Sequence, residues 1–134
     1  MRIALFLTTA VTLLLAGCDK ESLDGKGTGS AARITFLADS GFTYRNDTVG
    51  LGDTLHVGVH VAAGDDRIRS FLVEVSYDGS RTGIRKDSLH VTDDPFDYNT
   101  ALIMRNTAGT EQWTFICVEY DGDRTLRSLT FRVE

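Results

Sequence analysis

The sequence of 134 residues is poor in proline, cysteine and basic residues. It has one proline, two cysteines, and 14 lysines and arginines against 19 aspartates and glutamates, which gives a net charge of −5. A protein that binds nucleic acid by neutralising phosphates needs a surplus of positive charge, so we expect no nucleic-acid partner. The single proline and the 42% content of hydrophobic residues are typical of a folded domain. At this length we expect one small domain.

The sequence also lacks the motifs that carry catalysis or hold a cofactor. It has no Gly-x-Ser-x-Gly elbow and no glycine-rich phosphate loop between a strand and a helix. His56 and His60 lie four residues apart, but on a strand that spacing separates them by roughly 13 Å, too far to share a metal ion. The three carboxylates between Asp93 and Asp97 lack the order of an EF-hand loop and are typical of a solvated turn. We therefore predict that the protein is not an enzyme and has no catalytic residue, metal site or cofactor.

A short apolar run stands at the N-terminus. Arg2 supplies one positive charge, and an apolar stretch diluted by threonines follows from Ile3 to Leu15, which is typical of a secretory signal peptide. A membrane-spanning helix needs about 20 apolar residues, and the charged Asp19 arrives before that length is reached. The pattern favours a removable signal over a transmembrane anchor.

The run ends in Leu15-Ala16-Gly17-Cys18, which resembles the lipobox of bacterial lipoproteins. By that resemblance residues 1–17 are the signal peptide, and Cys18 becomes the first mature residue. Its sulfur would carry a diacylglyceryl group, and its amine would usually carry an acyl chain. Each buried methylene contributes about 0.8 kcal/mol, so two or three chains hold a protein stably at a membrane. The alternative is a cysteine that happens to follow a secretory signal.

Residues 18–32 combine glycines, serines and charges, which predicts a flexible tether. The acidic Asp19 and Glu21 resemble the export tags of Bacteroidetes-type surface lipoproteins. An aspartate in the position of Asp19 also resembles an inner-membrane retention signal of enterobacterial lipoproteins. The resemblances imply a lipid-anchored protein of the cell envelope, which we expect in the outer membrane. They leave open whether it faces the periplasm or the cell surface.

After the tether, apolar and polar residues alternate in short runs. We predict strands over residues 33–37, 54–61, 68–77, 83–91, 96–105, 113–120 and 126–133, separated by turns such as Asp78-Gly79-Ser80 and Asp121-Gly122-Asp123. No stretch of this region keeps a helical period for three turns. About seven strands in residues 33–134 predict an all-β, antiparallel sandwich. Within it Cys117, which has no disulfide partner if Cys18 is acylated, is expected to be a small buried hydrophobe.

The body of the chain resembles the immunoglobulin-like sandwich of Bacteroidetes-type lipoproteins. The resemblance rests on Arg33-Ile34-Thr35-Phe36-Leu37 at its start, on Val57-Gly58-Val59, and on the run from Gly109 to Phe115 that leads into the last hairpin. Domains of this kind serve as spacers, adhesion modules, and glycan-binding or partner-binding units. The fold alone therefore implies no particular activity.

Two sets of residues are candidate contact surfaces. The strand 113–120 is apolar on both faces, and its second face carries Ile116, Val118 and Tyr120. Since one face of a sandwich strand is normally wet, this face could contact another subunit, a partner or a ligand. Alternatively, it is shielded by long neighbours such as the arginines at positions 124, 127 and 132. The second candidate is a concave, aromatic-lined surface formed by Phe42, Tyr44, Phe96 and Tyr98.

The sequence therefore predicts a non-enzymatic binding or display module held at the membrane through covalent lipid, with a protein or glycan as its ligand. The alternative is a structural or accessory subunit that docks on a larger envelope complex through an exposed sheet face. The ligand and the oligomeric state are left open.

Overall fold

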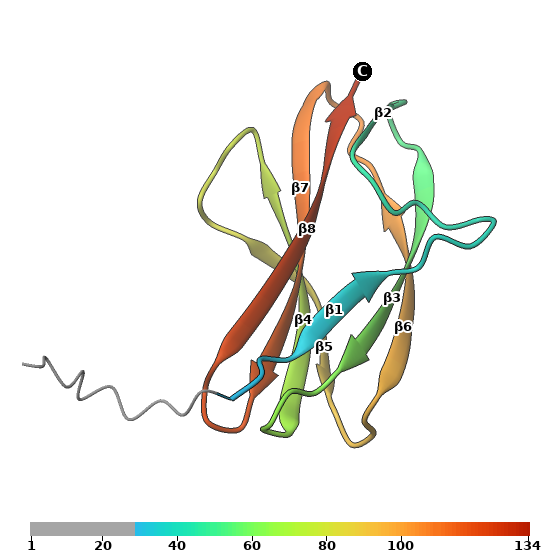
Figure 1. Cartoon of the computed structure of the whole chain (residues 1–134). Helices are drawn as coiled ribbons and strands as arrows, with labels where there is room; N and C mark the ends of the chain where they lie inside the picture. The colour runs from blue at the N-terminus through green and yellow to red at the C-terminus, as the bar shows by residue number, and fades with distance from the viewer. Residues whose placement is uncertain (1–28) are drawn as a thin grey trace, which may run out of the picture.

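A computed structural model of the protein describes residues 29–134, in which all regular secondary structure is β-strand (Figure 1). This range contains no helix long and apolar enough to cross a membrane. The predicted signal peptide, the lipobox residues Leu15, Ala16, Gly17 and Cys18, and most of the tether lie outside it. The strands are β1 (Arg33–Phe36), β2 (Asp47–Val49), β3 (Thr54–Ala62), β4 (Ile68–Tyr77), β5 (Ile84–His90), β6 (Phe96–Ile103), β7 (Gly109–Glu119) and β8 (Arg124–Val133).

The strands form two sheets that face each other across one core (Figure 1). One sheet has the order β1-β3-β6, and the other has the order β2-β8-β7-β4-β5. The predicted all-β sandwich is therefore confirmed. The sequence predicts about seven antiparallel strands; residues 29–134 contain eight, and the additional strand, β2, pairs in parallel with β8. With three residues, β2 is too short to show an alternating pattern in the sequence.

The alternation of apolar residues builds the core. On β3 the side chains of Val57, Val59 and Val61 are fully buried between the sheets, whereas His56 faces solvent, as predicted. The inward side chains of β7 and β8 complete the core from the opposite sheet. Burying one such aliphatic side chain contributes about 1.5–3 kcal/mol, so this pattern dominates the stability of the sandwich.

Aromatic rings fill the centre of the core. The ring of Phe71 lies 5.7 Å from that of Phe96, edge to face, and 5.2 Å from that of Tyr98. The ring of Phe115 stacks on that of Phe71, with centroids 6.3 Å apart, and packs edge to face with the ring of Phe36, with centroids 5.5 Å apart. Such pairs add about 0.5–1.5 kcal/mol each beyond the area they bury. They join β1 and β6 of one sheet to β4 and β7 of the other.

A segment after β1 covers the outer face of the three-stranded sheet. Its backbone is fixed by hydrogen bonds from Leu37 N to Gly58 O (2.9 Å) and from Thr43 N to His56 O (2.7 Å). A Cβ atom on Gly58 would lie 2.9 Å from Leu37 Cδ1 and 3.1 Å from Phe42 Cε1, and 2.7 Å from Asn99 Oδ1 of the neighbouring strand. The glycine therefore provides the space in which the side chains of Leu37 and Phe42 rest on β3.

Candidate binding surfaces

The two ends of the sandwich differ in role. At one end the chain enters the fold, where the backbone amide and hydroxyl of Ser30 donate to the carboxylate of Asp65 in the β3–β4 connection. The other end carries the β4–β5 and β6–β7 turns, β2 and the C-terminus (Figure 1). The ten residues of β4 run from one end of the sandwich to the other, so the two ends are about 30 Å apart. We call the end with the β4–β5 and β6–β7 turns the distal end.

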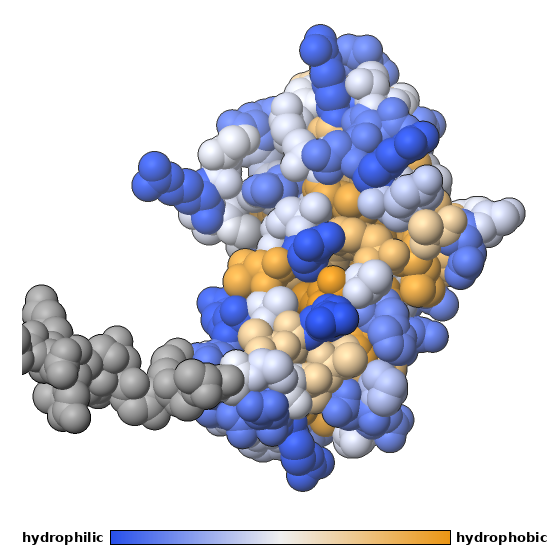
Figure 2. All heavy atoms as spheres, viewed as in Figure 1, coloured by the Kyte–Doolittle hydropathy of each residue, from blue (hydrophilic) through white to orange (hydrophobic). Residues whose placement is uncertain are grey.

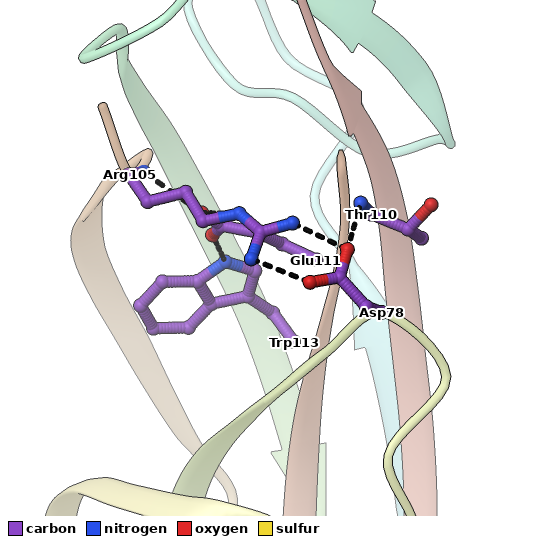
Figure 3. Close-up of polar contacts among 5 residues, drawn as sticks. All are labelled: Asp78, Arg105, Thr110, Glu111 and Trp113. Atoms are coloured by element: carbon purple, nitrogen blue, oxygen red, sulfur yellow. Dashed lines mark hydrogen bonds and ion pairs between the residues drawn. The ribbon is translucent and has the colours of Figure 1, made fainter. Parts of the chain in front are cut away.

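At the distal end Asp78 and Arg105 join two turns (Figure 3). The guanidinium of Arg105 donates to both carboxylate oxygens of Asp78, at 2.8 and 2.5 Å. The same carboxylate accepts a hydrogen bond from Thr110 N at 3.0 Å, and Asp78 N donates to Thr110 O at 2.8 Å. The hydrogen bonds from Arg105 and Thr110 lower the pKa of Asp78 to about 2. The β4–β5 turn is thereby fixed against the β6–β7 connection.

A buried carboxylate extends this network into the core. Glu111 is completely buried on the inner face of β7; one of its oxygens accepts from Arg105 N at 2.7 Å, and the other accepts from Trp113 Nε1 at 2.9 Å (Figure 3). The guanidinium of Arg105 also packs over the ring of Tyr77 at 5.1 Å. Buried charges are stable only when they are well hydrogen-bonded. This carboxylate therefore acts as a structural brace for the distal end.

This network is not predicted by the sequence. Asp78 is predicted only as a turn residue, and the structure confirms that turn, with φ of +52° at Asp78 and +75° at Gly79. Glu111 lies two residues before Trp113 and four before Phe115 on β7, so the alternation of the strand could have predicted a carboxylate on the inner face. Its partner Arg105 follows the end of β6, and no pattern in the sequence brings the two together.

A groove lies on the outer face of the five-stranded sheet. Its floor is β7, one wall is the β4–β5 hairpin, and the other wall is the start of β8; its volume is about 390 Å³. In Figure 2 the surface is hollowed beside this hairpin. The lining combines charged, hydroxyl, amide and apolar groups from Glu74, Ser76, Arg81, Gln112, Thr114, Ile116, Arg124 and Leu126, together with glycines of the hairpin.

The first predicted contact surface is largely covered. Ile116 and Val118 are only 2% and 7% exposed and form a small buried cluster with Leu72 on the outer face of the sheet. Of the two alternatives for this face, an open contact surface or a shielded one, the burial of Ile116 and Val118 matches the shielded one, and β7 is a central strand with neighbours on both sides. The exposed apolar groups on this side are Tyr120 (52%), which lies under Arg67, and Leu126 (53%).

The second predicted surface is divided between two faces of one sheet. Phe42 is half-buried on the outside, over Gly58, and Tyr44 is 43% exposed beside Arg45. Phe96 and Tyr98 instead point inward from β6. The four aromatic residues therefore do not form one concave surface. Sequence alternation placed Phe96 and Tyr98 on a common face, but it could not place the Phe42 segment, which is irregular.

Phe96 and Tyr98 line a shallow pocket of about 240 Å³ at the open side of the sandwich, between β5 and β6. The hydroxyl of Tyr98 donates to Asp87 of β5 at 2.6 Å and so bridges the two sheets. Burial, together with the bond to Asp87, raises the pKa of Tyr98 to about 12. The phenol is thus a neutral donor, which suits a structural bridge.

The remaining candidates are dispersed. His60 Nδ1 lies 2.6 Å from the carboxylate of Asp97, whereas the exposed His56 lies further along β3. No group of three or more His, Cys, Asp or Glu side chains in residues 29–134 is arranged to hold a metal ion. Cys117 is fully buried, as predicted, and burial raises the pKa of its thiol to about 12. At the tether end the neighbouring carboxylate of Asp121 raises the pKa of Asp66.

Comparisons with known proteins give similarities of fold only. No family model and no curated protein matches the sequence. A variant of the superoxide reductase (neelaredoxin) from Ignicoccus hospitalis is 14% identical, with a TM-score of 0.50, over 81% of this chain and 84% of that one. Fibronectin(III)-like modules of CbhA from Clostridium thermocellum are 15% identical, with a TM-score of 0.46, over 78% of this chain and 47% of that one.

A third similar structure is the CARDB domain of a Pyrococcus furiosus protein in complex with di-metal ions. It is 15% identical, with a TM-score of 0.44, over 79% of this chain and 89% of that one. At such identities a likeness concerns the fold alone. Residues 29–134 form a β-sandwich with one sheet of three strands and one sheet of five.

Proposed function

We propose that the protein is a lipid-anchored, non-enzymatic binding or display module of the bacterial cell envelope. The lipobox-like Leu15-Ala16-Gly17-Cys18 supplies the anchor. The observation that carries the proposal is the placement of two features at opposite ends of the sandwich. The chain enters the fold at Ser30, which is hydrogen-bonded to Asp65, and the distal end lies at the other end of β4. A domain anchored through Cys18 would hold its distal end away from the lipid.

The network at the distal end supports a binding role. Asp78, Arg105 and Glu111 hold the β4–β5 and β6–β7 turns in one arrangement. Surfaces that are ordered before binding lose less conformational entropy when a partner arrives.

The anchor is tested by incorporation of radiolabelled palmitate into the wild type and Cys18→Ala in a bacterial host. We expect label in the wild type and none in the variant, because the thiol of Cys18 is the acceptor of the diacylglyceryl group. Label in both proteins, or in neither, would contradict the proposal. Protease treatment of intact cells then assigns the side of the membrane: digestion indicates the cell surface, and protection indicates the periplasm.

A second candidate is an accessory subunit that docks beside a larger membrane complex. The exposed Leu126, next to the buried cluster of Leu72, Ile116 and Val118, favours it. Crosslinking in intact membranes separates the two. An accessory subunit should give one discrete larger species that Leu126→Asp removes and Arg81→Gln leaves in place, whereas a module that binds a partner in the groove should lose its crosslinks in both variants.

A further inference from the structure

The groove on the outer face of the five-stranded sheet is elongated along a strand. It runs along β7 from Gln112 to Ile116. Five residues of strand span roughly 13 Å between their first and last Cα atoms. An extended segment of about five residues would therefore lie along the groove.

The groove is positively charged in a protein of net charge −5. Arg81 lies in the hairpin wall and Arg124 lies at the start of β8. Within residues 29–134 neither side chain is paired with a carboxylate. The one acidic lining residue, Glu74, is 3.6 Å from Arg85, which offsets its charge. Two unpaired guanidinium groups facing one hollow favour an anionic occupant.

The floor between these cations is partly apolar. Ile116 and Leu126 pair across β7 and β8, and Leu126 is half exposed. Ser76 and Gln112 add groups that can hydrogen-bond a peptide backbone. None of the described lining residues is aromatic, so a sugar ring has no aromatic face to stack on. The groove therefore fits a polypeptide better than an anionic glycan.

We propose that this groove binds an extended acidic segment of a partner protein. Carboxylates near the two ends of the segment would pair with Arg81 and Arg124, and an apolar side chain between them would contact Leu126. The proposal rests on the binding role proposed above and gives that role a site and a partner chemistry.

The test is a fluorescence-anisotropy titration of the full chain, purified from whole-cell lysate in detergent. The probe is a fluorescein-labelled peptide of about eight residues, with a glutamate near each end, a central leucine and serines elsewhere. The competing ligand is polygalacturonate, an anionic polysaccharide. The variants are Arg81→Gln, Arg124→Gln and Leu126→Ser, and the matched control is Arg33→Gln, an exposed arginine on the other sheet.

We expect saturable binding of the peptide that each of the three groove variants weakens at least about threefold, with Arg33→Gln unchanged. Absence of saturable binding, or equal loss in Arg33→Gln, would overturn the proposal. Binding of polygalacturonate instead of the peptide, lost in Arg81→Gln and Arg124→Gln, would also overturn it in favour of a glycan. Palmitate labelling of the same cells tests the anchor separately, so peptide binding without label would refute the lipoprotein and leave the groove in place.

Discussion

The carboxylate of Asp78 binds the guanidinium of Arg105 through both of its oxygens, across 27 positions of the sequence. Each residue follows the end of a strand in a different sheet, Asp78 after β4 and Arg105 after β6. The pair therefore ties the two sheets together at the distal end. Planar, bidentate pairs of this kind are the strongest ion pairs in proteins because two hydrogen bonds fix their geometry.

Replacement of Asp78 by asparagine should lower stability in a pH-dependent way. The pKa of Asp78 is held at about 2 in the fold, below its ordinary value of 3.8, by the hydrogen bonds from Arg105 and Thr110. The stabilisation is complete above about pH 4 and is lost as the pH falls through about 2. We expect a lower urea midpoint for Asp78→Asn at neutral pH, and a difference from wild type that shrinks toward pH 2.

The matched control is Asp39→Asn, an exposed carboxylate outside the network. Its free energy of unfolding in urea should stay within about 0.5 kcal/mol of the wild type across the pH range. A constant difference between Asp78→Asn and wild type from pH 7 to pH 2 would show that the pair does not carry this stability.

Glu111→Gln should destabilise the domain. Both carboxylate oxygens accept hydrogen bonds, from Arg105 N and from Trp113 Nε1. A glutamine presents one amide NH₂ to one of these donors and so leaves a buried donor unsatisfied, which costs about 1–3 kcal/mol. Urea unfolding measures the loss, and Glu134→Gln, an exposed carboxylate at the C-terminus, serves as the control. Equal midpoints for the two variants would mean that Glu111 is not a brace.

Ile116→Asp and Leu126→Asp should behave differently although the two residues are cross-strand neighbours. Ile116 is 2% exposed, so an aspartate there buries a charge without a partner and should unfold the domain or cost more than about 3 kcal/mol. Leu126 is half exposed, so its substitution should leave the circular dichroism spectrum and the melting temperature near the wild-type values. A folded Ile116→Asp would mean that this face is open surface.

Gly58→Val should release the segment that covers the three-stranded sheet. The added side chain would occupy the space of Leu37 and Phe42, and overpacking of this kind costs about 1–3 kcal/mol. We expect faster proteolysis within residues 38–46. The control His56→Val introduces the same side chain two residues earlier on the same face of β3, at a position that is exposed, and should leave the cleavage rate unchanged. Equal rates in the two variants would show that Gly58 has no such role.

The alternation of the sequence predicts seven of the eight strands in residues 29–134. It placed Val57, Val59 and Val61 inward, and it gave β4 its observed bounds, Ile68–Tyr77. The turn at Asp78 and the buried Cys117 were predicted as well. These features are local, because a period of two residues and a glycine-containing turn are visible within a few positions.

The features that could not be predicted depend on contacts between distant segments. β2 exists because it pairs with the last residues of β8, and its three residues carry no pattern of their own. The burial of Ile116 depends on the order of strands in the sheet, which alternation does not specify. Arg81 and Arg124 border one groove although they lie in separate hairpins. Such long-range contacts are formed only by the complete topology.

The proposed attachment of the sandwich to a membrane through Cys18 is tested most directly by the mass of the mature full chain. Intact-protein mass spectrometry of the chain purified from membranes should give a polypeptide that begins at Cys18 and carries a diacylglyceryl group, usually with a further acyl chain. The fragment ions should place the added mass on the first residue. A chain that still begins at Met1, or one cleaved elsewhere with an unmodified Cys18, would contradict the account.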